Sequence, residues 1–313
     1  MDLAHLVSAL HRNLPGPVRW SGSVARRMRQ FNIALEDKKS GSSNTDALTL
    51  ADLTVQELLV GALRDGDPAF RHCKIAAEET TGDLLRFATD SPFTLCLDPI
   101  DGTKQYRDKT GNGYSVILTL QGRDTLHYSL VLLPEWGPHG TWVEVQGDRG
   151  VTGPDDPARP AVEVLASFPP VTRTTWNQTA AGRGESKKIY MIGFQQHDRA
   201  KARLVTQAGL EGVAADDCPG SIYELMASGA YAGSLIHSPN IYDFPASLHV
   251  ARVLGGDALW VHNRQPVNFH ETWMDERAKM LRLPGIVATS PDRQVLDTLC
   301  AVARDWNPIR YAE

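Results

Sequence analysis

The chain has 313 residues, of which 42% are hydrophobic and 22% charged, and its net charge is −5. This length is typical of two αβ lobes rather than of one simple core. No cluster of Lys and Arg stands out, and a grip on a phosphate backbone needs a basic face, so a nucleic-acid polymer is not an expected partner. A small basic pocket for a phosphorylated metabolite is compatible with this charge.

The chain carries no sign of export or of a membrane span. Residues 1–17 interleave apolar residues with His, Ser and Arg, so they do not resemble a secretory signal. No run of 18 apolar residues occurs, and no membrane partner is expected. The four cysteines are scattered without a C-x-x-C pair, which indicates reduced thiols in a cytoplasmic protein rather than a zinc site.

The first 65 residues show apolar residues at helical spacing and predict helices, interrupted by Leu-Pro-Gly-Pro at residues 14–17. A polar loop is expected at residues 38–46. Loops of this composition are mobile and can lie over an active site. A third helix should start near Asp52 and pass through Leu58 and Leu59.

The middle of the chain predicts strands, because short apolar runs are separated by turn residues. We expect these strands at residues 93–97, 114–120 and 127–133. The stretch 147–160 is dense in Gly, Pro and Asp, and we take it, with residues 167–170, as the neighbourhood of a lobe boundary. The expected lobes are residues 1–165, which carry most metal ligands, and residues 166–313, which close the site and contact substrate.

The second half alternates strands with helices, a pattern that indicates a layered α/β architecture. The expected strands are 188–194, 234–237, 258–261 and 286–288, and the expected helices are 198–208, 221–232, 246–254 and 293–304.

The most informative segment runs from Asp98 to Thr103 and reads Asp-Pro-Ile-Asp-Gly-Thr, directly after the strand expected at residues 93–97. Two carboxylates three residues apart across a proline-braced turn can converge on a hard cation, and Mg²⁺ prefers such oxygen ligands. Gly102 lets the backbone approach a ligand closely, and the amides from Gly102 to Lys104 would point at phosphate if a helix starts there. Taken alone, the motif also fits an acidic turn with an Asp helix cap.

Further acids lie elsewhere along the chain. Glu78 and Glu79 follow an apolar-leaning segment, Asp52 closes Thr-Leu-Ala-Asp, and Asp243 closes Asn-Ile-Tyr-Asp. Each has a plain alternative: Glu78 and Glu79 as solvated loop acids, Asp52 and Asp243 as helix caps.

In their order along the chain, Thr-x-Ala-Asp, Glu-Glu, Asp-Pro-Ile-Asp-Gly-Thr and Tyr-Asp resemble the inositol monophosphatase superfamily, which is related to fructose-1,6-bisphosphatase. The resemblance spans roughly residues 20–300. Lys-Gln-Tyr at residues 104–106 and Gly-Asn-Gly-Tyr-Ser-Val at residues 111–116 are similar to its 3′(2′),5′-bisphosphate nucleotidase branch. The resemblance implies an α/β (α+β) fold, built as a layered αβαβα sandwich, and a lithium-sensitive, Mg²⁺-dependent phosphatase.

The resemblance also implies a role for each matching residue. Two or three Mg²⁺ ions per site would be held by Glu78, Asp98, the Ile100 carbonyl, Asp101 and Asp243. The attacking water would be oriented and activated by Asp52 and Thr103. Phosphate and the rest of the substrate would contact Gly102, Thr103, Lys104, Gly220 and Ser221.

Some residues depart from the family pattern and bear on the substrate. Tyr242 stands where relatives usually carry Trp, and Phe244 stands where small residues are common. Gly-Phe-Gln-Gln-His at residues 193–197 replaces a Ser-Arg-Ser-His-like run that helps contact substrate in relatives. Glu224 stands near a position where nucleotidases often have Lys. Lys104 is equally compatible with meeting a second phosphate and with an ordinary surface position.

The expected function is therefore a Mg²⁺-dependent phosphomonoesterase for a small soluble phosphate ester, with 3′(2′),5′-bisphosphate nucleotidase-like activity as the leading form. One alternative is a phosphatase for a sugar, cyclitol or nucleoside phosphate in a dedicated biosynthetic pathway. An alternative of another class is a non-catalytic phosphate-binding protein on the same fold. The expected partner is a small phosphorylated metabolite, and the chain would act as a monomer or homodimer.

Overall fold

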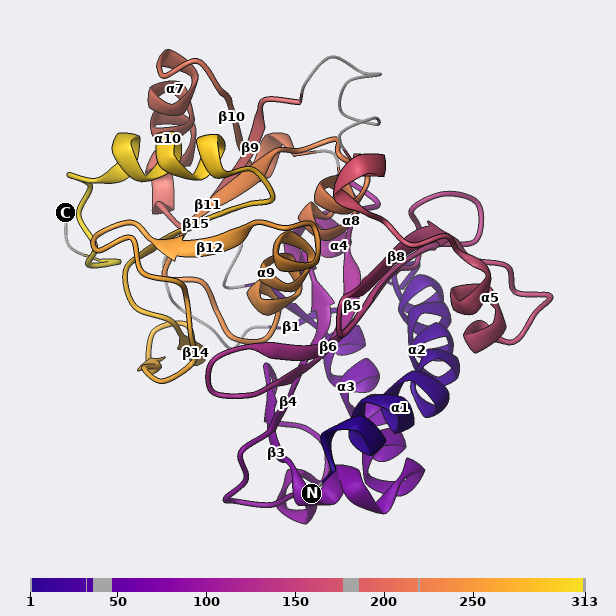
Figure 1. Cartoon of the computed structure of the whole chain (residues 1–313). Helices are drawn as coiled ribbons and strands as arrows, with labels where there is room; N and C mark the ends of the chain where they lie inside the picture. Colours follow the sequence, from indigo (N-terminus) through magenta and orange to yellow (C-terminus); the bar gives the residue numbers. More distant parts are fainter. Residues whose placement is uncertain (1, 32, 36–46, 177–185, 219, 312–313) are drawn as a thin grey trace.

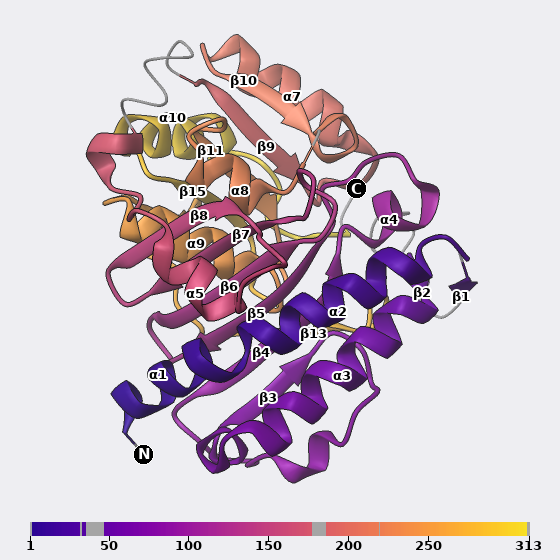
Figure 2. The same ribbon diagram turned by 90° about the vertical axis from the view of Figure 1, so that its right-hand side faces the viewer.

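A computed structural model describes residues 2–31, 33–35, 47–176, 186–218 and 220–311. The polar loop expected at residues 38–46 lies outside these described residues. Figures 1 and 2 show two β-sheets separated and flanked by helices, with the N-terminal half of the chain around one sheet and the C-terminal half around the other.

The described helices lie before, between and after the strands of the two large sheets. The α-helices are α1 (Leu3–Asn13), α2 (Pro15–Met28), α3 (Leu50–Gly66), α4 (Thr103–Asp108), α5 (Ala161–Ser167), α7 (Asp198–Gln207), α8 (Ile222–Ala227), α9 (Phe244–Val253) and α10 (Arg293–Ala303). Short 3₁₀ turns are η1 (Pro68–His72), η2 (Leu84–Arg86), η3 (Gln195–His197) and η4 (Ala215–Asp217).

The first large sheet has the order β3-β4-β5-β6-β7-β8, in which only the β3–β4 pair is parallel. Its strands are β3 (Lys74–Ala77), β4 (Thr94–Asp101), β5 (Ser115–Gln121), β6 (Leu126–Leu133), β7 (Thr141–Gln146) and β8 (Arg149–Pro154). Short turns join β5 to β6 and β7 to β8, as antiparallel pairing allows, whereas α4 lies between β4 and β5.

The second large sheet has the order β10-β9-β11-β15-β12, and β15 runs antiparallel to both of its neighbours. Its strands are β9 (Lys188–Ile192), β10 (Glu211–Ala214), β11 (Gly233–His237), β12 (Asp257–Trp260) and β15 (Ile286–Ser290). Two small pairs complete the strands: β1 (Ala34–Leu35) with β2 (Leu48–Thr49), and β13 (Trp273–Asp275) with β14 (Met280–Arg282).

The layers follow from which helices pack on which sheet. Helices α2 and α3 lie against the first sheet on its outer face, and α7 and α10 cover the second sheet. Helices α8 and α9 contact each other and lie between the sheets, where α9 touches β6 on one side and β12 and β15 on the other. The predicted αβαβα sandwich is thereby confirmed.

Capping residues fix several helix starts. The Asp2 carboxylate accepts the Ala4 amide at 2.9 Å to begin α1, and Pro15 occupies the first turn of α2. The Asp292 carboxylate accepts the Gln294 amide at 2.8 Å to begin α10. Within the described residues, no helix combines the length and apolar character needed to cross a membrane.

The element predictions were wrong in three places. The pairing of β1 with β2 interrupts a region expected to be helical. The strand expected to end at residue 97 continues to Asp101. The helix expected at 221–232 ends at Ala227, because Gly229 adopts a φ of 74° that a right-handed helix excludes.

The stability of the fold should depend on pH through His249, a buried residue of α9. Its Nδ1 lies 2.7 Å from the Ser129 hydroxyl of β6, and burial lowers the pKa of His249 to about 3, aided by the neighbouring charges of Arg252 and His127. The unfolded chain takes up a proton on this residue below about pH 6.5, and the folded chain does so only near pH 3. Stability from the buried neutral imidazole is therefore lost as the pH falls below about 6.5.

We expect this linkage to be visible in His249→Gln. Between about pH 7 and about pH 5.5, the free energy of unfolding of the wild type should fall by about 1 kcal/mol more than that of the variant. Urea unfolding at both pH values measures the difference. Equal losses in the two proteins would contradict a neutral His249.

Candidate active site

Asp98 and Asp101 lie on one side of β4 because the strand carries a bulge between them. In the β4–β5 register, Asp98 pairs with Ile117 and Asp101 with Ser115, so three steps along β4 match two along β5. Regular alternation would place residues three apart on opposite faces of a sheet, and one extra residue brings them to the same face. The bulge therefore makes the Asp-Pro-Ile-Asp spacing able to converge on one point.

Asp243 reaches the same point from the C-terminal half of the chain, where it precedes α9. Its Oδ2 accepts from the Asn240 side-chain amide at 2.9 Å, while Asn240 Oδ1 accepts the backbone amides of Tyr242 and Asp243. This tight turn fixes the Asp243 carboxylate at the start of α9. Asp243 thus lies directly before α9, as expected, and also belongs to the acidic cluster.

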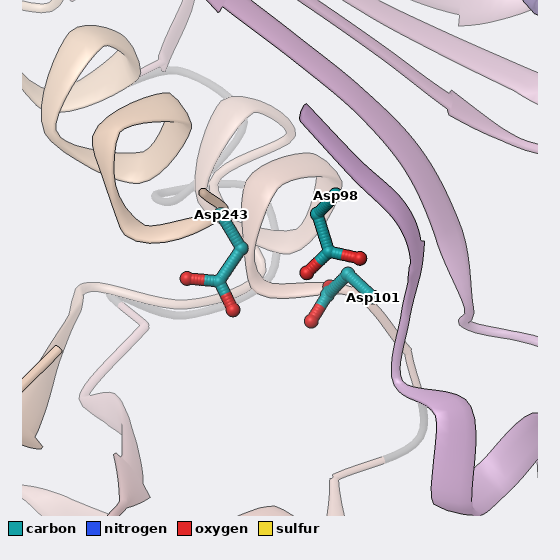
Figure 3. Close-up of side chains that lie close together, drawn as sticks. All are labelled: Asp98, Asp101 and Asp243. Carbon is teal, nitrogen blue, oxygen red and sulfur yellow. The ribbon is translucent and has the colours of Figure 1, made fainter. Parts of the chain in front are cut away.

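The carboxylates of Asp98, Asp101 and Asp243 offer oxygens that all lie within 4.8 Å of one another (Figure 3). Burial, reinforced by the neighbouring acids, raises the pKa of Asp98 and of Asp243 well above the ordinary range. Burial likewise raises the pKa of Asp101 to about 6, although the Ser115 hydroxyl donates to its Oδ2 at 3.1 Å. Three carboxylates this close repel one another as anions.

The donor set fits a hard divalent cation. Asp98 is only 2% exposed, and its Oδ1 is buried without a hydrogen-bond partner among the described residues. A buried carboxylate oxygen without a donor is costly, and a cation both satisfies it and removes the repulsion from Asp101 and Asp243. Oxygen ligands from three carboxylates are typical of Mg²⁺ or Ca²⁺ sites.

Glu78 and Ile100, the other expected ligands, lie beside this cluster. Glu78 follows β3, lines the same cleft, and its charge contributes to the raised pKa of Asp98 and Asp101. The Ile100 carbonyl accepts from the Thr103 hydroxyl at 2.7 Å. Three of the five expected ligands therefore meet within one cluster, and two stand at its side.

Asp52 and Thr103 form a buried carboxylate–hydroxyl pair. Thr103 Oγ1 lies 3.1 Å from Asp52 Oδ1, and Asp52 Oδ2 accepts from the amide and hydroxyl of Thr49 at 2.7 and 2.6 Å. Asp52 is 1% exposed, and burial raises its pKa to about 7, against the lowering effect of the Thr49 hydroxyl. Asp52 thus forms a capping box with Thr49 at the start of α3 and also contacts Thr103 of α4.

Helix α4 is held in place by Arg29, a residue that the sequence interpretation missed. Its guanidinium donates to the carbonyls of Gln105, Tyr106 and Gly111 and pairs with Glu135. Gly102, at the start of α4, has a φ of 83°, a conformation that favours glycine and permits the sharp turn from β4 into the helix. No local pattern around Arg29 predicts these contacts, because all of them are long-range.

The backbone of Gly220 and Ser221 packs closely against Gly113 in the N-terminal half of the chain. A Cβ added to Gly113 would lie 2.4 Å from Gly220 Cα, and one added to Gly220 would lie 2.8 Å from the Trp136 ring. Ser221 lines the cleft, and its hydroxyl is buried without a hydrogen-bond partner among the described residues. Two glycines are therefore needed where the segments meet.

Gly113→Ala should displace the Gly220–Ser221 segment and lower kcat/KM by about 10- to 100-fold. A shift of about 1 Å in residues that position a substrate is enough to slow the reaction by this much. Gly61→Ala in α3 is the matched control, since nothing lies within 4 Å of its added Cβ. That control should keep its turnover and gain up to about 1 kcal/mol of stability. Steady-state kinetics test both, and undiminished turnover in Gly113→Ala would contradict the contact.

All expected site residues except Asp52 border one open cleft. The cleft is lined by Glu78, Asp98, Ile100, Asp101, Gly102, Thr103, Lys104, Gly220, Ser221 and Asp243, together with residues of β9, η3, η4 and β11. Lys104 Nζ lies 2.7 Å from Asp216 Oδ1, so it is paired rather than free.

Comparison with known proteins identifies the relationship. The family model described as the inositol monophosphatase family matches residues 18–304. The chain belongs to this family. A search of curated proteins finds no significant match to this member of the inositol monophosphatase family.

Solved structures show the same fold at low sequence identity. The suhB extragenic suppressor protein from Bartonella henselae aligns with a TM-score of 0.62 and 13% identity, covering 96% of this chain and 100% of that one. CysQ from Bacteroides thetaiotaomicron, a bacterial member of the family, aligns with a TM-score of 0.59 and 14% identity, covering 91% and 98%. Staphylococcal inositol monophosphatase-1, solved as an inhibitory complex after soaking in 100 mM LiCl, has a TM-score of 0.62 and 13% identity, covering 100% and 99%.

Membership in the inositol monophosphatase family supports a metal-dependent phosphatase that acts on small phosphorylated metabolites, and enzymes of this family use Mg²⁺. The sequence interpretation missed Asp198 and Asp216, which also line the cleft. They belong to α7 and η4, where no motif distinguishes them from solvated loop residues. Gln195 of η3 lines the cleft too, within the segment 193–197 that the resemblance compared with a substrate-contacting run.

Proposed function

We propose that this protein is a Mg²⁺-dependent phosphomonoesterase. The observation that carries the proposal is the convergence of Asp98, Asp101 and Asp243, with a buried Asp98 oxygen that has no partner among the described residues. Glu78 and the Ile100 carbonyl stand beside the trio and would complete the coordination of two or three ions. Lithium sensitivity is part of the proposal, in keeping with the LiCl-inhibited staphylococcal relative.

Bound Mg²⁺ would neutralise charge on the phosphoryl group and on the leaving oxygen, which is what phosphoryl transfer chiefly requires. The chain's own residues position the reactants. The Gly102 and Thr103 amides would bind phosphate oxygens, and Gly220 and Ser221 would contact the rest of the substrate.

Asp52 and Thr103 would handle the proton of the attacking water. The Thr103 hydroxyl has one proton, which can go to Asp52 Oδ1 at 3.1 Å or to the Ile100 carbonyl at 2.7 Å. When the proton is donated to ionised Asp52, a Thr103 lone pair is free to accept from water. The proton can then pass through Thr103 to Asp52, whose pKa of about 7 in the absence of metal suits a group that accepts protons near neutral pH. Positive charge in the site would lower that pKa and keep Asp52 ionised.

We further propose that residues 1–165 and 166–313 act as two lobes that meet at the cleft. The first contributes Asp52, Glu78 and the Asp98–Thr103 segment, and the second contributes Gly220, Ser221 and Asp243. A small-molecule site between lobes is a common location for catalysis.

Two forms of this function differ in the leaving group of the substrate: a bisphosphate nucleotidase-like activity, and a phosphatase for a sugar, cyclitol or nucleoside phosphate. Lys104 is equally compatible by sequence with a second phosphate and with a surface position, and its 2.7 Å pair with Asp216 supports a monophosphate of a sugar, cyclitol or nucleoside over a bisphosphate. A test is phosphate release from adenosine 3′,5′-bisphosphate, nucleoside monophosphates, inositol-1-phosphate and sugar phosphates, with and without Mg²⁺. Mg²⁺-dependent release from at least one ester is expected; metal binding without any release would favour a non-catalytic phosphate-binding protein.

A further inference from the structure

Asp216 and Lys104 form an ion pair at the cleft between two segments that are far apart in the sequence. Lys104 is the second residue of α4, directly after Thr103, and Asp216 belongs to η4 in the C-terminal half. Their charged atoms lie 2.7 Å apart, and the side chains are 25% and 48% exposed, so both remain accessible to a bound ligand. The pair places a carboxylate beside the lysine nearest to the expected phosphate position.

The other cations of the cleft are also paired. Arg282 Nε lies 2.8 Å from Asp275 Oδ2, and Arg310 Nε lies 3.8 Å from the same oxygen. Among the described residues that line the cleft, every Lys or Arg thus lies within 4.0 Å of a carboxylate, and Arg282 and Arg310 share that of Asp275. A second carboxylate, Asp198, lines the cleft as well, so a second anionic group on the substrate would meet like charge.

Uncharged polar groups in the same cleft lack partners. Gln195 Nε2 and Ser221 Oγ are both buried without a hydrogen-bond partner among the described residues. Gln195 also has a φ of 55°, a backbone conformation that non-glycine residues seldom adopt and that surrounding structure must hold. An amide donor and a hydroxyl in these positions are complementary to substrate hydroxyl groups.

We propose that Asp216 is a specificity determinant that pairs with Lys104 and thereby disfavours substrates with a second anionic group. The substrate class is then a phosphate monoester of an uncharged, hydroxyl-rich molecule, bound through groups such as Gln195 and Ser221. This inference rests on the proposed phosphomonoesterase function. In this account, selectivity arises from electrostatic repulsion of bisphosphates and from hydrogen bonds to the hydroxyl groups of a monophosphate.

The test compares fructose-6-phosphate with fructose-1,6-bisphosphate, two esters that differ by one phosphate. Wild-type kcat/KM should favour the monophosphate, and Asp216→Asn should raise the bisphosphate-to-monophosphate ratio about tenfold by releasing Lys104 and removing a negative charge. Lys104→Met added to Asp216→Asn should abolish that gain. Calorimetric binding of both esters supplies the same ratio independently of turnover.

The matched control is Asp217→Asn, because Asp217 is the next residue, pairs with Arg199 on the surface and does not line the cleft. Its ratio should equal that of the wild type. Equal ratios in wild type, Asp216→Asn and Asp217→Asn, or a wild-type preference for the bisphosphate, would overturn the inference while leaving the phosphatase intact. Absence of turnover of every ester by the wild type would instead overturn the proposed function, and this inference with it.

Discussion

Asp101→Asn should lower kcat by about a thousandfold, equivalent to about 4 kcal/mol of transition-state stabilisation. The substitution keeps the shape of the side chain and an acceptor for the Ser115 hydroxyl, but it removes one of three carboxylates that share a cluster within 4.8 Å. The change should also weaken Mg²⁺ binding, because a neutral amide is a poorer ligand than a carboxylate. Steady-state phosphate release and calorimetric Mg²⁺ titration measure the two effects.

The same variant should be more stable than the wild type when metal is absent. The raised pKa of Asp101, about 6, means that the folded chain holds a proton that the unfolded chain has already released, so stability is lost as pH rises from about 4 through about 6. Asn removes this penalty, with a gain of as much as about 3 kcal/mol at neutral pH. Mg²⁺ should stabilise the wild type and have little effect on the variant.

Asp108→Asn is a suitable control for these measurements, because Asp108 is an exposed acid of α4 that pairs with neighbouring Arg107. It should behave like the wild type in turnover and in its thermal response to Mg²⁺. If Asp101→Asn kept wild-type turnover, or if Asp108→Asn lost turnover equally, the acidic cluster would not be the catalytic metal site.

The second large effect is expected at Thr103. Thr103→Val removes the hydroxyl that lies 3.1 Å from Asp52 and 2.7 Å from the Ile100 carbonyl, at nearly constant volume. Loss of the proton path should lower kcat by about 10²- to 10³-fold. Mg²⁺ affinity should change little, since no carboxylate is lost, and this separates the proton-transfer role from metal binding.

Thr103→Ser should restore most of the turnover, because it returns a hydroxyl to the same position. Thr54→Val is the control: Thr54 is a partly exposed residue of α3 whose hydroxyl donates to the Leu50 carbonyl, and the variant should retain wild-type kinetics. A Thr103→Val protein with full kcat would rule out the proposed passage of a proton through Thr103 to Asp52.

The sequence interpretation located the acidic cluster and the family from short ordered motifs. The acids Asp98, Asp101 and Asp243 were expected together, and the family profile over residues 18–304 agrees with the resemblance on which that expectation rested. The αβαβα layers were likewise expected, because strand and helix periodicity in the second half is regular.

The remainder depends on contacts between distant segments. No pattern predicts the bulge that turns Asp98 and Asp101 to one side of β4, because a bulge is defined by pairing with another strand. Nor does any pattern predict that Lys104 meets Asp216, a residue in an acidic turn with the usual appearance of a solvated loop. The proposed substrate selectivity, which rests on this pair, is accordingly the property least predictable from the sequence.

Phosphate release from the wild-type protein, measured after chelation and again as Mg²⁺ is restored stepwise, tests the proposed metal-dependent phosphatase most directly. A parallel calorimetric titration gives Mg²⁺ occupancy in the same sample. We expect no release in excess chelator and a recovery of turnover that follows Mg²⁺ occupancy. Release that persists undiminished in chelator, or full Mg²⁺ occupancy without release from any ester tested, would contradict it.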